Sequence, residues 1–434
     1  MTKPVKFYND LMEGAPQITN TNGSLTAMLD AVLANGFGVR TATGISFSAG
    51  IATITFAATH KYSLNQVVEV SSVPQAEYNG QFNVIGKTTF TISYYVNGTP
   101  PAPTGTPSVK IPSLNFEIAF TGTNKRAYRS KNILSSRLYL RVDDSLDPVY
   151  NTAYAKKGKV SVIESMSDID TITGAQAPYD PANITKNHIG TGTGATAIDG
   201  WYKWYYAKTQ NTGTYPSDVD GTSSGNRSWV IVGDDRGFYL FISCDDVNGG
   251  RTGYCFTDFE SFRQGDAYST ILTATDWYAL ANSTTPNGYA SNCADFNTKF
   301  AASLDFTGKV IMKDYQQVGS NVRAGFMGLG SQNGQVVSGL NTGVVYPNGP
   351  DYGLIVHPTY LKQENNHIRG KMPGMMWVHN DQPLQHFEFV DGILGYPGRK
   401  FLVITTTHFT GTAYENNGNI NKARIVFDVT GPWY

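Results

Sequence analysis

The chain carries little charge and few cysteines, and it has no long apolar run. Charged residues are 15% of its 434 residues, whereas ordinary soluble domains average roughly 25%. The 33 basic and 34 acidic residues are spread along the chain without a basic stripe, which argues against nucleic-acid binding. A net charge of −1 leaves little long-range repulsion to oppose self-association.

The three cysteines, Cys244, Cys255 and Cys293, form an odd and loosely spaced set. They match no zinc-ligand spacing, and we favour reduced thiols in a protein made in the cytosol over a disulfide between Cys244 and Cys255. No run of about 18 apolar residues occurs, and no apolar core of signal-peptide length follows Met1. The sequence therefore predicts neither export by that route nor a membrane anchor.

Aromatic residues and glycine are abundant instead. The chain has 26 Tyr, 22 Phe and 45 Gly, in a background rich in Thr, Ser and Asn. β-Branched and aromatic residues suit a pleated surface, while Gly, Asn and Asp supply turns. The length is enough for two or three domains, each with its own core. We therefore predict a mainly β fold.

One amphipathic helix is expected ahead of this β-rich sequence, from Ser24 to Asn35. Ser24 is expected to cap its N-terminus, and Gly36 to end it. Apolar residues recur at helical spacing on one face, at Leu25, Met28, Leu29, Val32 and Leu33. A lone helix must pack on a sheet or on another subunit. We predict that this face is a docking interface for assembly, on an N-terminal arm that spans residues 1–40.

Residues 41–109 have the pattern of a small separate β-module. Short β-branched and aromatic runs alternate with turn signals such as Ala49-Gly50 and Asn97-Gly98, which predicts a small barrel or sandwich. Prolines crowd the stretch from Thr99 to Pro107, which cannot donate regularly into a strand ladder. This stretch marks a domain boundary.

Residues 110–434 are expected to form a larger β-sandwich-like region with long loops, and a division into two subdomains stays open. Polar, Gly-rich segments indicate surface loops at Ala175 to Thr196 and Thr209 to Asn226. Asp258 to Arg263 and Thr275 to Leu280 are expected as short helices. The convincing strands are Leu138 to Val142, Lys159 to Glu164, Trp229 to Val232, Phe238 to Ser243, Lys309 to Met312, Gly353 to Val356, Phe401 to Thr406 and Arg424 to Val429.

Close acidic pairs are the first candidates for chemistry: Asp143-Asp144, Asp168 with Asp170, Asp234-Asp235 and Asp245-Asp246. Adjacent strand residues point to opposite faces, so such a pair alone cannot supply both carboxyl groups of a glycosidase. The run from Asp234 to Gly237 is typical of a charged hairpin turn with a local Asp–Arg pair. Asp168 and Asp170 offer two oxygens to Ca²⁺ but lack the rest of an EF-hand loop. We predict no catalytic residue, cofactor or metal site.

Histidines and glycines give no stronger signal. Five of the seven histidines lie late in the chain, without the close spacing of a catalytic zinc site: His357, His367, His379, His386 and His408. No G-x-S-x-G elbow is present. Glycines at 325, 328 and 330 and from Gly190 to Gly194 lack the surroundings of nucleotide-binding loops, so they predict ordinary loops.

The aromatic cluster from Trp201 to Tyr206 allows two interpretations. Exposed aromatic faces can stack on carbohydrate, which would make the cluster a sugar platform. Trp201 and Tyr205 share one face of the expected strand and Trp204 lies on the other, as in a strand buried between two layers. We favour core or subunit interface, and keep Trp201, Trp204 and Tyr205 as candidates for glycan or subunit contact.

Several blocks of sequence are recognisable: Gly14-Ala15-Pro16, Asn22-Gly23-Ser24-Leu25, Asn35-Gly36-Phe37-Gly38, Val67-Val68-Glu69-Val70, Glu77-Tyr78-Asn79-Gly80, Arg141-Val142-Asp143-Asp144, Glu164-Ser165-Met166-Ser167-Asp168, Val232-Gly233-Asp234-Asp235-Arg236-Gly237-Phe238-Tyr239 and Thr430-Gly431-Pro432-Trp433. They resemble virion structural proteins of tailed bacteriophages, in which the same helix precedes a small β-module. The segment His60 to Gly86 resembles a module that recurs in phage tail and head accessory proteins. The resemblance implies no catalytic residues.

The resemblance implies a non-enzymatic structural component of a tailed phage particle, in the tail, baseplate or head–tail region. Such a protein is made in the host bacterial cytoplasm, resides in the virion, and contacts copies of itself and other virion proteins through large interfaces. The alternatives are a head decoration or fibre protein, and a host-glycan-binding adhesin or depolymerase. We expect no nucleic-acid or membrane partner. We also expect that residues 1–38 can be removed without loss of the β fold.

Overall fold

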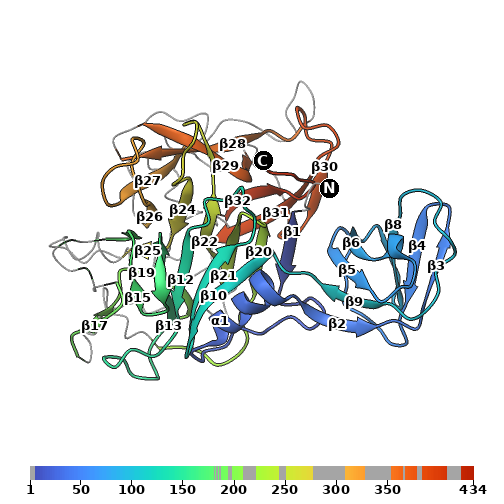
Figure 1. Cartoon of the computed structure of the whole chain (residues 1–434), viewed down its shortest axis with the longest axis horizontal. Helices are drawn as coiled ribbons and strands as arrows, with labels where there is room; N and C mark the ends of the chain where they lie inside the picture. The colour runs from blue at the N-terminus through green and yellow to red at the C-terminus, as the bar shows by residue number, and fades with distance from the viewer. Residues whose placement is uncertain are drawn as a thin grey trace.

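The computed structural model describes most of the chain. The described residues are 5–179, 181, 184, 187–193, 198–208, 221–243, 251–276, 308–327, 353–364, 367–378, 384–407 and 422–434. The fold is mainly β, as predicted, with one short helix near the N-terminus. Figure 1 shows a large β-rich body and a smaller module that projects from it on strands β2 and β9.

The largest sheet has thirteen described strands and brings both ends of the chain together. Its path runs through β1 (Lys6–Asn9), β20 (Trp229–Asp234), β21 (Gly237–Ser243), β22 (Arg251–Asp258), β24 (Thr270–Thr273), β26 (Lys309–Ile311), β27 (Val322–Met327), β28 (Val356–Gln363), β29 (Ile368–Val378), β32 (Lys422–Asp428), β31 (Lys400–Thr407) and β30 (Phe389–Asp391), with β23 (Glu260–Ser261) on β29. Its N-terminal strand β1 pairs antiparallel with β20, so residues 6–9 are part of the body.

A second sheet of seven described strands packs on the first. It runs through β10 (Phe116–Gly122), β11 (Lys125–Ser130), β12 (Tyr139–Asp143), β13 (Lys156–Ile163), β19 (Tyr202–Ala207) and β25 (Thr275–Asp276), with β16 (Gln176–Ala177) on β13. Aromatic contacts join the two sheets: the Trp204 ring stacks on Tyr254 at 5.7 Å and meets Phe238 edge-on at 6.0 Å. Two small ladders pair β14 (Met166–Asp168) with β15 (Thr171–Ile172) and β17 (Gly190–Thr191) with β18 (Ile198–Asp199).

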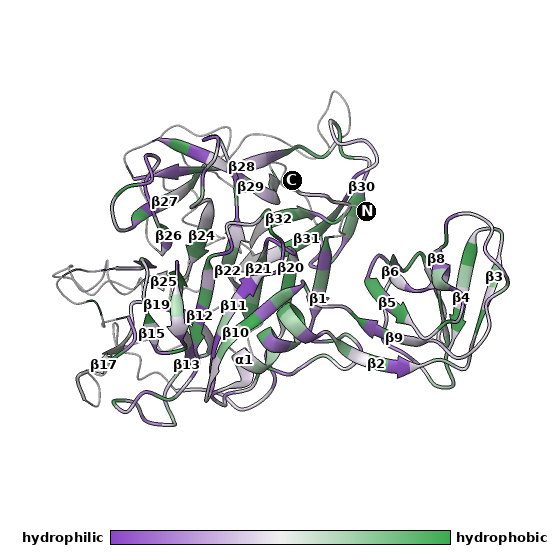
Figure 2. Cartoon of the chain, viewed as in Figure 1, coloured by the Kyte–Doolittle hydropathy of each residue, from purple (hydrophilic) through white to green (hydrophobic). Residues whose placement is uncertain are grey.

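The projecting module consists of two four-stranded sheets. One is β2 (Phe37–Thr41), β9 (Ser108–Ile111), β5 (Val67–Ser71) and β6 (Gly80–Asn83), and the other is β3 (Gly44–Ser48), β4 (Ile51–Thr55), β8 (Thr91–Tyr95) and β7 (Gly86–Lys87). A 3-10 turn spans Ala76–Tyr78. Figure 2 shows hydrophobic residues along β4, whose buried positions alternate as a strand with one face toward an interior requires. The domain boundaries at residues 40 and 109 stay predictions, although β2 and β9 extend past both.

The predicted helix forms, but its N-terminal cap is different. Helix α1 (Ser24–Leu29) continues as one π-helical stretch, η1 (Asp30–Asn35), before Gly36 at φ +73° ends it. The Ser24 hydroxyl donates to the Thr19 carbonyl at 3.2 Å and does not cap the helix. The Asp144 carboxylate takes that role from beyond β12, since its Oδ2 accepts from the Gly23 amide at 2.8 Å.

The docking prediction for this helix is wrong in the structure. The five side chains of the apolar face, Leu25, Met28, Leu29, Val32 and Leu33, are 0% exposed and belong to the main hydrophobic core of the chain itself. The helix packs against its own sheets, which is the other option that its amphipathic pattern allowed. An interface with another subunit must therefore use different residues.

Of the two short helices expected in the body, the first is not found, and the second lies mostly outside the described residues. Asp258 ends β22, and Glu260–Ser261 form β23. Thr275–Asp276 form β25, and residues 277–280 lie outside the described part of the chain. Weak helical periodicity in such short segments gives way to sheet pairing. Within the described residues, the helices are too short and too polar to cross a bilayer.

Candidate functional site

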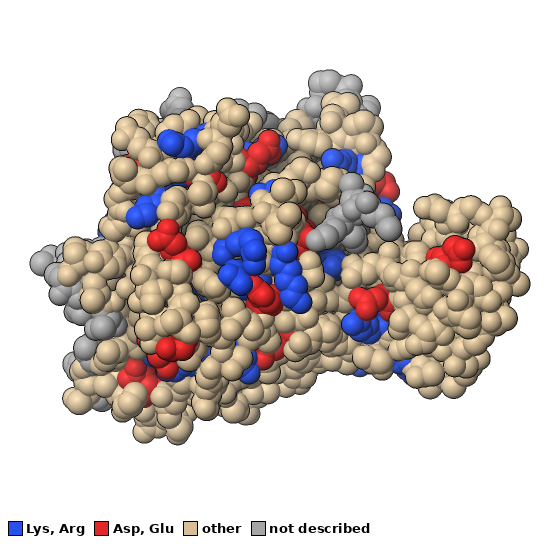
Figure 3. Space-filling view, viewed as in Figure 1, with Lys and Arg blue, Asp and Glu red and all other residues tan. Residues whose placement is uncertain are grey.

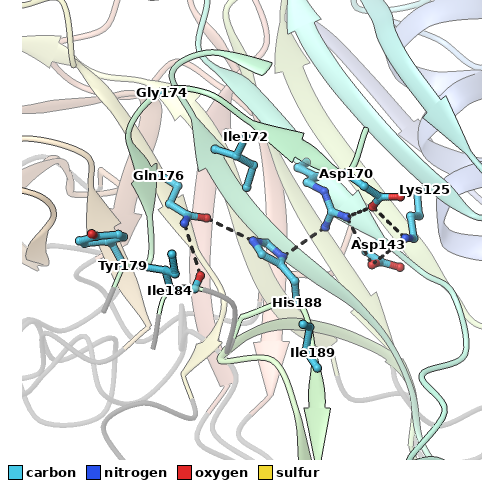
Figure 4. A pocket seen from close by; sticks show the side chains of 11 residues that line it. Lys125, Asp143, Asp170, Ile172, Gly174, Gln176, Tyr179, Ile184, His188 and Ile189 are labelled. Carbon is cyan, nitrogen blue, oxygen red and sulfur yellow. Dashed lines mark hydrogen bonds and ion pairs between the residues drawn. The ribbon is translucent and has the colours of Figure 1, made fainter. Parts of the chain in front are cut away.

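A cavity of about 530 Å³ opens beside β12, β13 and the segment that follows β15. Figure 4 shows charged side chains on one side of it and polar and aliphatic side chains on the other. Its lining consists of Lys125, Arg141, Asp143, Asp170, Ile172, Gly174, Gln176, Tyr179, Ile184, His188 and Ile189. These residues come from β11, β12 and three later segments, so the site exists only in the folded chain.

Arg141 is the centre of the charged side. Its guanidinium donates to the Ile169 carbonyl at 2.8 Å and to Asp170 Oδ1 at 2.8 Å, and it lies 3.6 Å from Asp143 Oδ2. The side chain is only 4% exposed, so its charge depends on these partners. Lys125 also reaches Asp170 Oδ1, at 2.8 Å. The two cations and two carboxylates therefore compensate one another.

His188 links the charged and polar sides as a neutral ring. Burial lowers its pKa to about 3, with further lowering by the charges of Arg141 and Lys159. Arginine can only donate, so His188 Nδ1 accepts the 3.2 Å hydrogen bond from Arg141 Nη1. The proton then sits on Nε2, which donates to Gln176 Oε1 at 3.2 Å. One tautomer satisfies both contacts.

The two carboxylates of the cavity are held ionised. Burial alone would raise the pKa of Asp143, but Lys159 and its other polar neighbours outweigh burial and lower it. For Asp170, burial is likewise outweighed by Lys125 and Arg141, and the pKa is lowered. Behind the lining, Lys159 Nζ contacts Asp147 Oδ2 at 3.2 Å and the His188 carbonyl at 3.0 Å. The network is therefore paired through several layers.

This arrangement lacks a protonated acid. Glycoside hydrolysis uses one carboxyl group with a raised pKa as proton donor and a second as base or nucleophile. Asp143 and Asp170 both have lowered pKa values, and both face the same cations. Neutral His188 already uses both ring nitrogens. The chemistry that the cavity supports best is polar contact without proton transfer.

Two acids with raised pKa values lie elsewhere and have structural partners. Burial raises the pKa of Asp144 to about 8, although Tyr206 and three backbone amides of the helix N-terminus donate to it and lower the pKa. Tyr206 Oη donates to Asp144 Oδ1 at 2.6 Å. Asp143 and Asp144 thus serve opposite faces, as predicted from their adjacency. Burial also raises the pKa of Asp234 to about 7.

The hairpin predicted from Asp234 to Gly237 is confirmed, whereas its ion pair is not local. Asp235 and Arg236 form the two-residue turn between β20 and β21, and the Arg236 amide donates to Asp234 Oδ1 at 2.8 Å. The Arg236 guanidinium instead approaches Asp258 Oδ2 at 3.4 Å. The carboxylates of Asp168 and Asp170 have different partners. Asp168 Oδ1 accepts a hydrogen bond from the Asp170 amide, whereas Asp170 Oδ1 accepts one from Arg141.

The predicted aromatic contacts lie in the interior. Trp201, Trp204 and Tyr205 are 2%, 0% and 1% exposed. Trp204 Nε1 donates to the Thr273 carbonyl at 2.7 Å, and the Tyr205 amide donates to Tyr254 Oη at 2.9 Å. Burial between layers, the interpretation we favoured, therefore applies, and these three residues do not form an exposed glycan platform.

The remaining candidates stay apart or fall outside the described residues. Cys255 is a buried free thiol, and burial raises its pKa to about 12. In the described part of the chain, no three His, Cys, Asp or Glu side chains are placed to hold a metal ion. His357, His367 and His386 lie on or beside separate strands, β28, β29 and β31. Candidates outside the described residues are Cys244, Cys293, Asp245, Asp246, His379, His408, Gly328 and Gly330.

Sequence reasoning missed Lys125, Gln176 and His188 as site residues. Each lies in an ordinary strand or loop context, and His188 falls in a segment expected to be a polar surface loop. The only local signal was Arg141 between the apolar residues Leu140 and Val142 of one strand, since an arginine at such a position needs buried partners. Those partners could not be named before the strand order was known.

Comparisons with known proteins give little further information. No family model matches the chain, and no curated protein matches it. Among solved structures, the chain is similar to the phage phi92 endosialidase, with 10% sequence identity and a TM-score of 0.15. The match covers 91% of this chain and 52% of the endosialidase chain, so this chain spans about half the length of the endosialidase. A TM-score this low defines no shared fold.

Proposed function

We propose that the chain is a structural component of a tailed bacteriophage particle, in the tail, baseplate or head–tail region. It works through contacts with copies of itself and with other virion proteins, without turnover of a substrate. The proposal starts from the blocks of sequence that resemble phage virion proteins. What supports it most is that several of these blocks, distant in sequence, contact one another in the folded chain.

The first meeting point joins the start of the chain to the module. Gly14 and Gly38 belong to different blocks, and a methyl group on Gly14 would lie 2.7 Å from the Gly38 Cα atom, while one on Gly38 would meet the Glu13 carbonyl oxygen. Gly38 also has φ +66°, which other residues adopt with strain. Glycine is therefore needed in both blocks for the two backbones to approach.

The second meeting point joins the helix block to the Arg141–Asp144 block. Asn22 Nδ2 donates to the Asp144 carbonyl at 3.1 Å, and the Gly23 amide donates to Asp144 Oδ2 at 2.8 Å. The third joins the hairpin block to the C-terminal block, where the Tyr239 and Trp433 rings lie 5.8 Å apart, edge to face. The contacting residues of these blocks thus maintain a scaffold, while Arg141 and Asp143 of the second block line the cavity beside β12.

The cavity favours the non-enzymatic function over the depolymerase alternative. Its carboxylates are ionised and paired, and the predicted sugar-stacking aromatics are buried. A projecting module beside a broad β body suits a subunit that contacts several neighbours. Large contacts of this kind draw on aromatic residues, which are frequent here.

Imaging of purified particles tests the proposal. We expect an antibody or fused tag on this chain to decorate the tail, baseplate or head–tail region in electron micrographs, and the chain to be detected by mass spectrometry of the same particles. Labelling over the head or along fibres would favour the decoration or fibre alternative. Absence from purified particles would refute the proposal, and so would release of oligosaccharides from host polysaccharide by the isolated chain.

A further inference from the structure

The hairpin of β3 and β4 carries no charged residue. From Thr41 to Thr59 the chain contains no Lys, Arg, Asp or Glu. Figure 1 places this hairpin at the end of the module furthest from the body. Strand β3 pairs with β4 and with no other described strand, so it is an edge of its sheet. An uncharged edge at an exposed tip needs an explanation.

Natural proteins protect sheet edges with short strands, charges or bulges, and two of the other three module edges, β7 and β2, follow this rule. Strand β7 has two residues and ends at Lys87. Strand β2 carries Arg40 and a register shift against β9. Strand β6 begins at Gly80 with φ +137°. Strand β3 has five residues in unbroken register with β4, without proline or charge, and is the longest uncharged edge strand of the module.

The turn geometry fixes which backbone groups of β3 are available. Ala49 and Gly50 have φ +49° and +79°, as a type I′ turn requires, and Ser48 pairs with Ile51 beside it. Hydrogen-bonded and non-hydrogen-bonded pairs alternate in an antiparallel ladder. Ser46 and Ser48 therefore bond toward β4, while the amides and carbonyls of Ile45 and Phe47 point outward along the free edge.

The side chains of β3 also suit a further strand. Ile45 and Phe47 are half-buried and pack against the module core, where the Phe47 ring meets Tyr78 edge-on at 5.6 Å. Ser46 is exposed on the opposite face, across from Thr53. A strand added at this edge would cover the two apolar side chains and leave the serine row on the surface.

We propose that β3 pairs antiparallel with β3 of a second copy of this chain, about a twofold axis at Ser46. The pairing joins two four-stranded module sheets into one continuous sheet, and Ile45 of each copy exchanges backbone hydrogen bonds with Phe47 of the other. This inference rests on the proposed function, because it names one of the contacts through which the subunits assemble.

Self-complementarity singles out a second copy as the partner. In a twofold antiparallel pair each strand faces its own reversed sequence, so a central charge would meet the same charge. Reversing Gly44–Ser48 places glycine against serine, isoleucine against phenylalanine, and Ser46 against itself. Aromatic and β-branched side chains form favourable cross-strand pairs. The net charge of −1 adds little repulsion.

Cysteine cross-linking of the full-length chain tests the pairing. In the proposed register the two Ser46 residues form a non-hydrogen-bonded pair, whose Cα atoms lie about 4.5 Å apart and suit a disulfide. Ser46→Cys should therefore convert most of the chain to a disulfide-linked dimer under mild oxidation. Ser48→Cys is the matched control, because Ser48 is exposed on the same face but faces Gly44 of the other copy. It should remain at the level of the unsubstituted chain.

A charge at the same position gives a second, independent test. Ser46→Lys places two ammonium groups against each other across the axis and should abolish the concentration-dependent dimer in sedimentation velocity. Thr55→Lys adds the same charge at an exposed position of the inner strand β4 and should leave the dimer intact. Equal cross-linking of both cysteine variants, or a chain that stays monomeric and uncross-linked, would overturn the pairing. The isolated chain is used, so either result is separate from whether the chain occurs in particles.

Discussion

The body and the module of this chain bury different kinds of side chain. Among described residues, the body encloses many charged groups, including the paired set around Arg141 and the ion pair of Arg369 with Asp266 at 2.9 Å. Residues 37–111 are described throughout, and there the buried side chains are apolar apart from Gln66. On the face in Figure 3, Lys and Arg gather over the body while the module shows few charges.

This difference implies different sensitivities. Apolar burial depends little on pH or salt, whereas a buried charge depends on the ionisation of each partner. We therefore expect the body to respond strongly to acid and to loss of single charged residues. The module should respond mainly to changes in its apolar interior, and its exposed edges are free to serve assembly.

The largest effect is expected from deletion of residues 1–38, which removes β1 and the whole helix from the body. Strand β1 pairs with β20 over four residues, and five helix side chains are fully buried, so the deleted chain should fail to fold. This reverses the expectation drawn from sequence. Near-ultraviolet circular dichroism and solubility are the measurements.

Excision of the module is the matched control for this deletion. Arg40 lies opposite Val109 in the β2–β9 ladder, so the two strands can be joined by a short Gly linker in place of residues 41–108. The body should keep its native spectrum. A soluble, native-like product from the 1–38 deletion would contradict the assignment of β1 and the helix to the body.

Removal of the Arg141 charge should be the most damaging of the single substitutions. Arg141→Met removes the more buried of the two cations that Asp143 and Asp170 share and the donor to His188, which should cost about 3–5 kcal/mol of unfolding free energy. Arg129→Met on the neighbouring strand removes a pair that is 29% and 32% exposed, and it should cost less than about 1 kcal/mol. Urea denaturation measures both. Equal costs would show that the cavity network is not structural.

Features that depend on residues close in the chain could be predicted from the sequence, whereas those that depend on distant residues could not. The hairpin at Asp235-Arg236 and the helix from Ser24 to Asn35 depend on residues close in the chain, and both were predicted. The cap by Asp144 depends on a residue far from the helix, and a local candidate, Ser24, was chosen instead. Local periodicity fixes which face is apolar, but not what covers it.

The cavity escaped prediction for the same reason. Its charged and polar residues come from β11, β12, the turn between β14 and β15, and segments after β15, and no spacing in the sequence relates them. The aromatic cluster at Trp204 was interpretable because its aromatic residues occupy both faces of one strand, which indicated burial on both faces. For the cavity, as for the Asp144 cap, the missing information is the order of the strands and not the type of residue.

A smaller difference between the body and the module is expected in how much stability each loses when the pH is lowered. Because burial lowers the pKa of His188 to about 3 in the folded chain, against about 6.5 when unfolded, the unfolded state takes up a proton first. The stability that the neutral His188 ring contributes to the folded chain is complete above pH 6.5 and is lost as the pH falls toward 3. His188→Gln keeps an acceptor and a donor without this titration, so the variant should lose less stability between pH 7 and 4 than the original chain.

His60 in the module provides the control for this acid response. Burial lowers its pKa as well, and its ring shares one hydrogen bond with the Thr91 carbonyl at 3.1 Å. The Thr91 carbonyl and the Glu13 carboxylate offset part of this lowering of the pKa, so His60→Gln should change the acid dependence less. Unfolding curves at several pH values measure the acid dependence of both variants. A larger change from His60→Gln than from His188→Gln would contradict the expectation that the body is the more acid-sensitive region.

The smallest effect is expected for the ion pair of Lys110 with Glu69 in the module. The two side chains lie 3.1 Å apart across β9 and β5, and they are 36% and 32% exposed. Water and salt screen such a pair, so Lys110→Met should change the unfolding free energy by less than about 1 kcal/mol. Added salt should barely alter the unfolding midpoint of the module. A loss as large as that of Arg141→Met would show that the module also depends on charge, and would remove the contrast between the two regions.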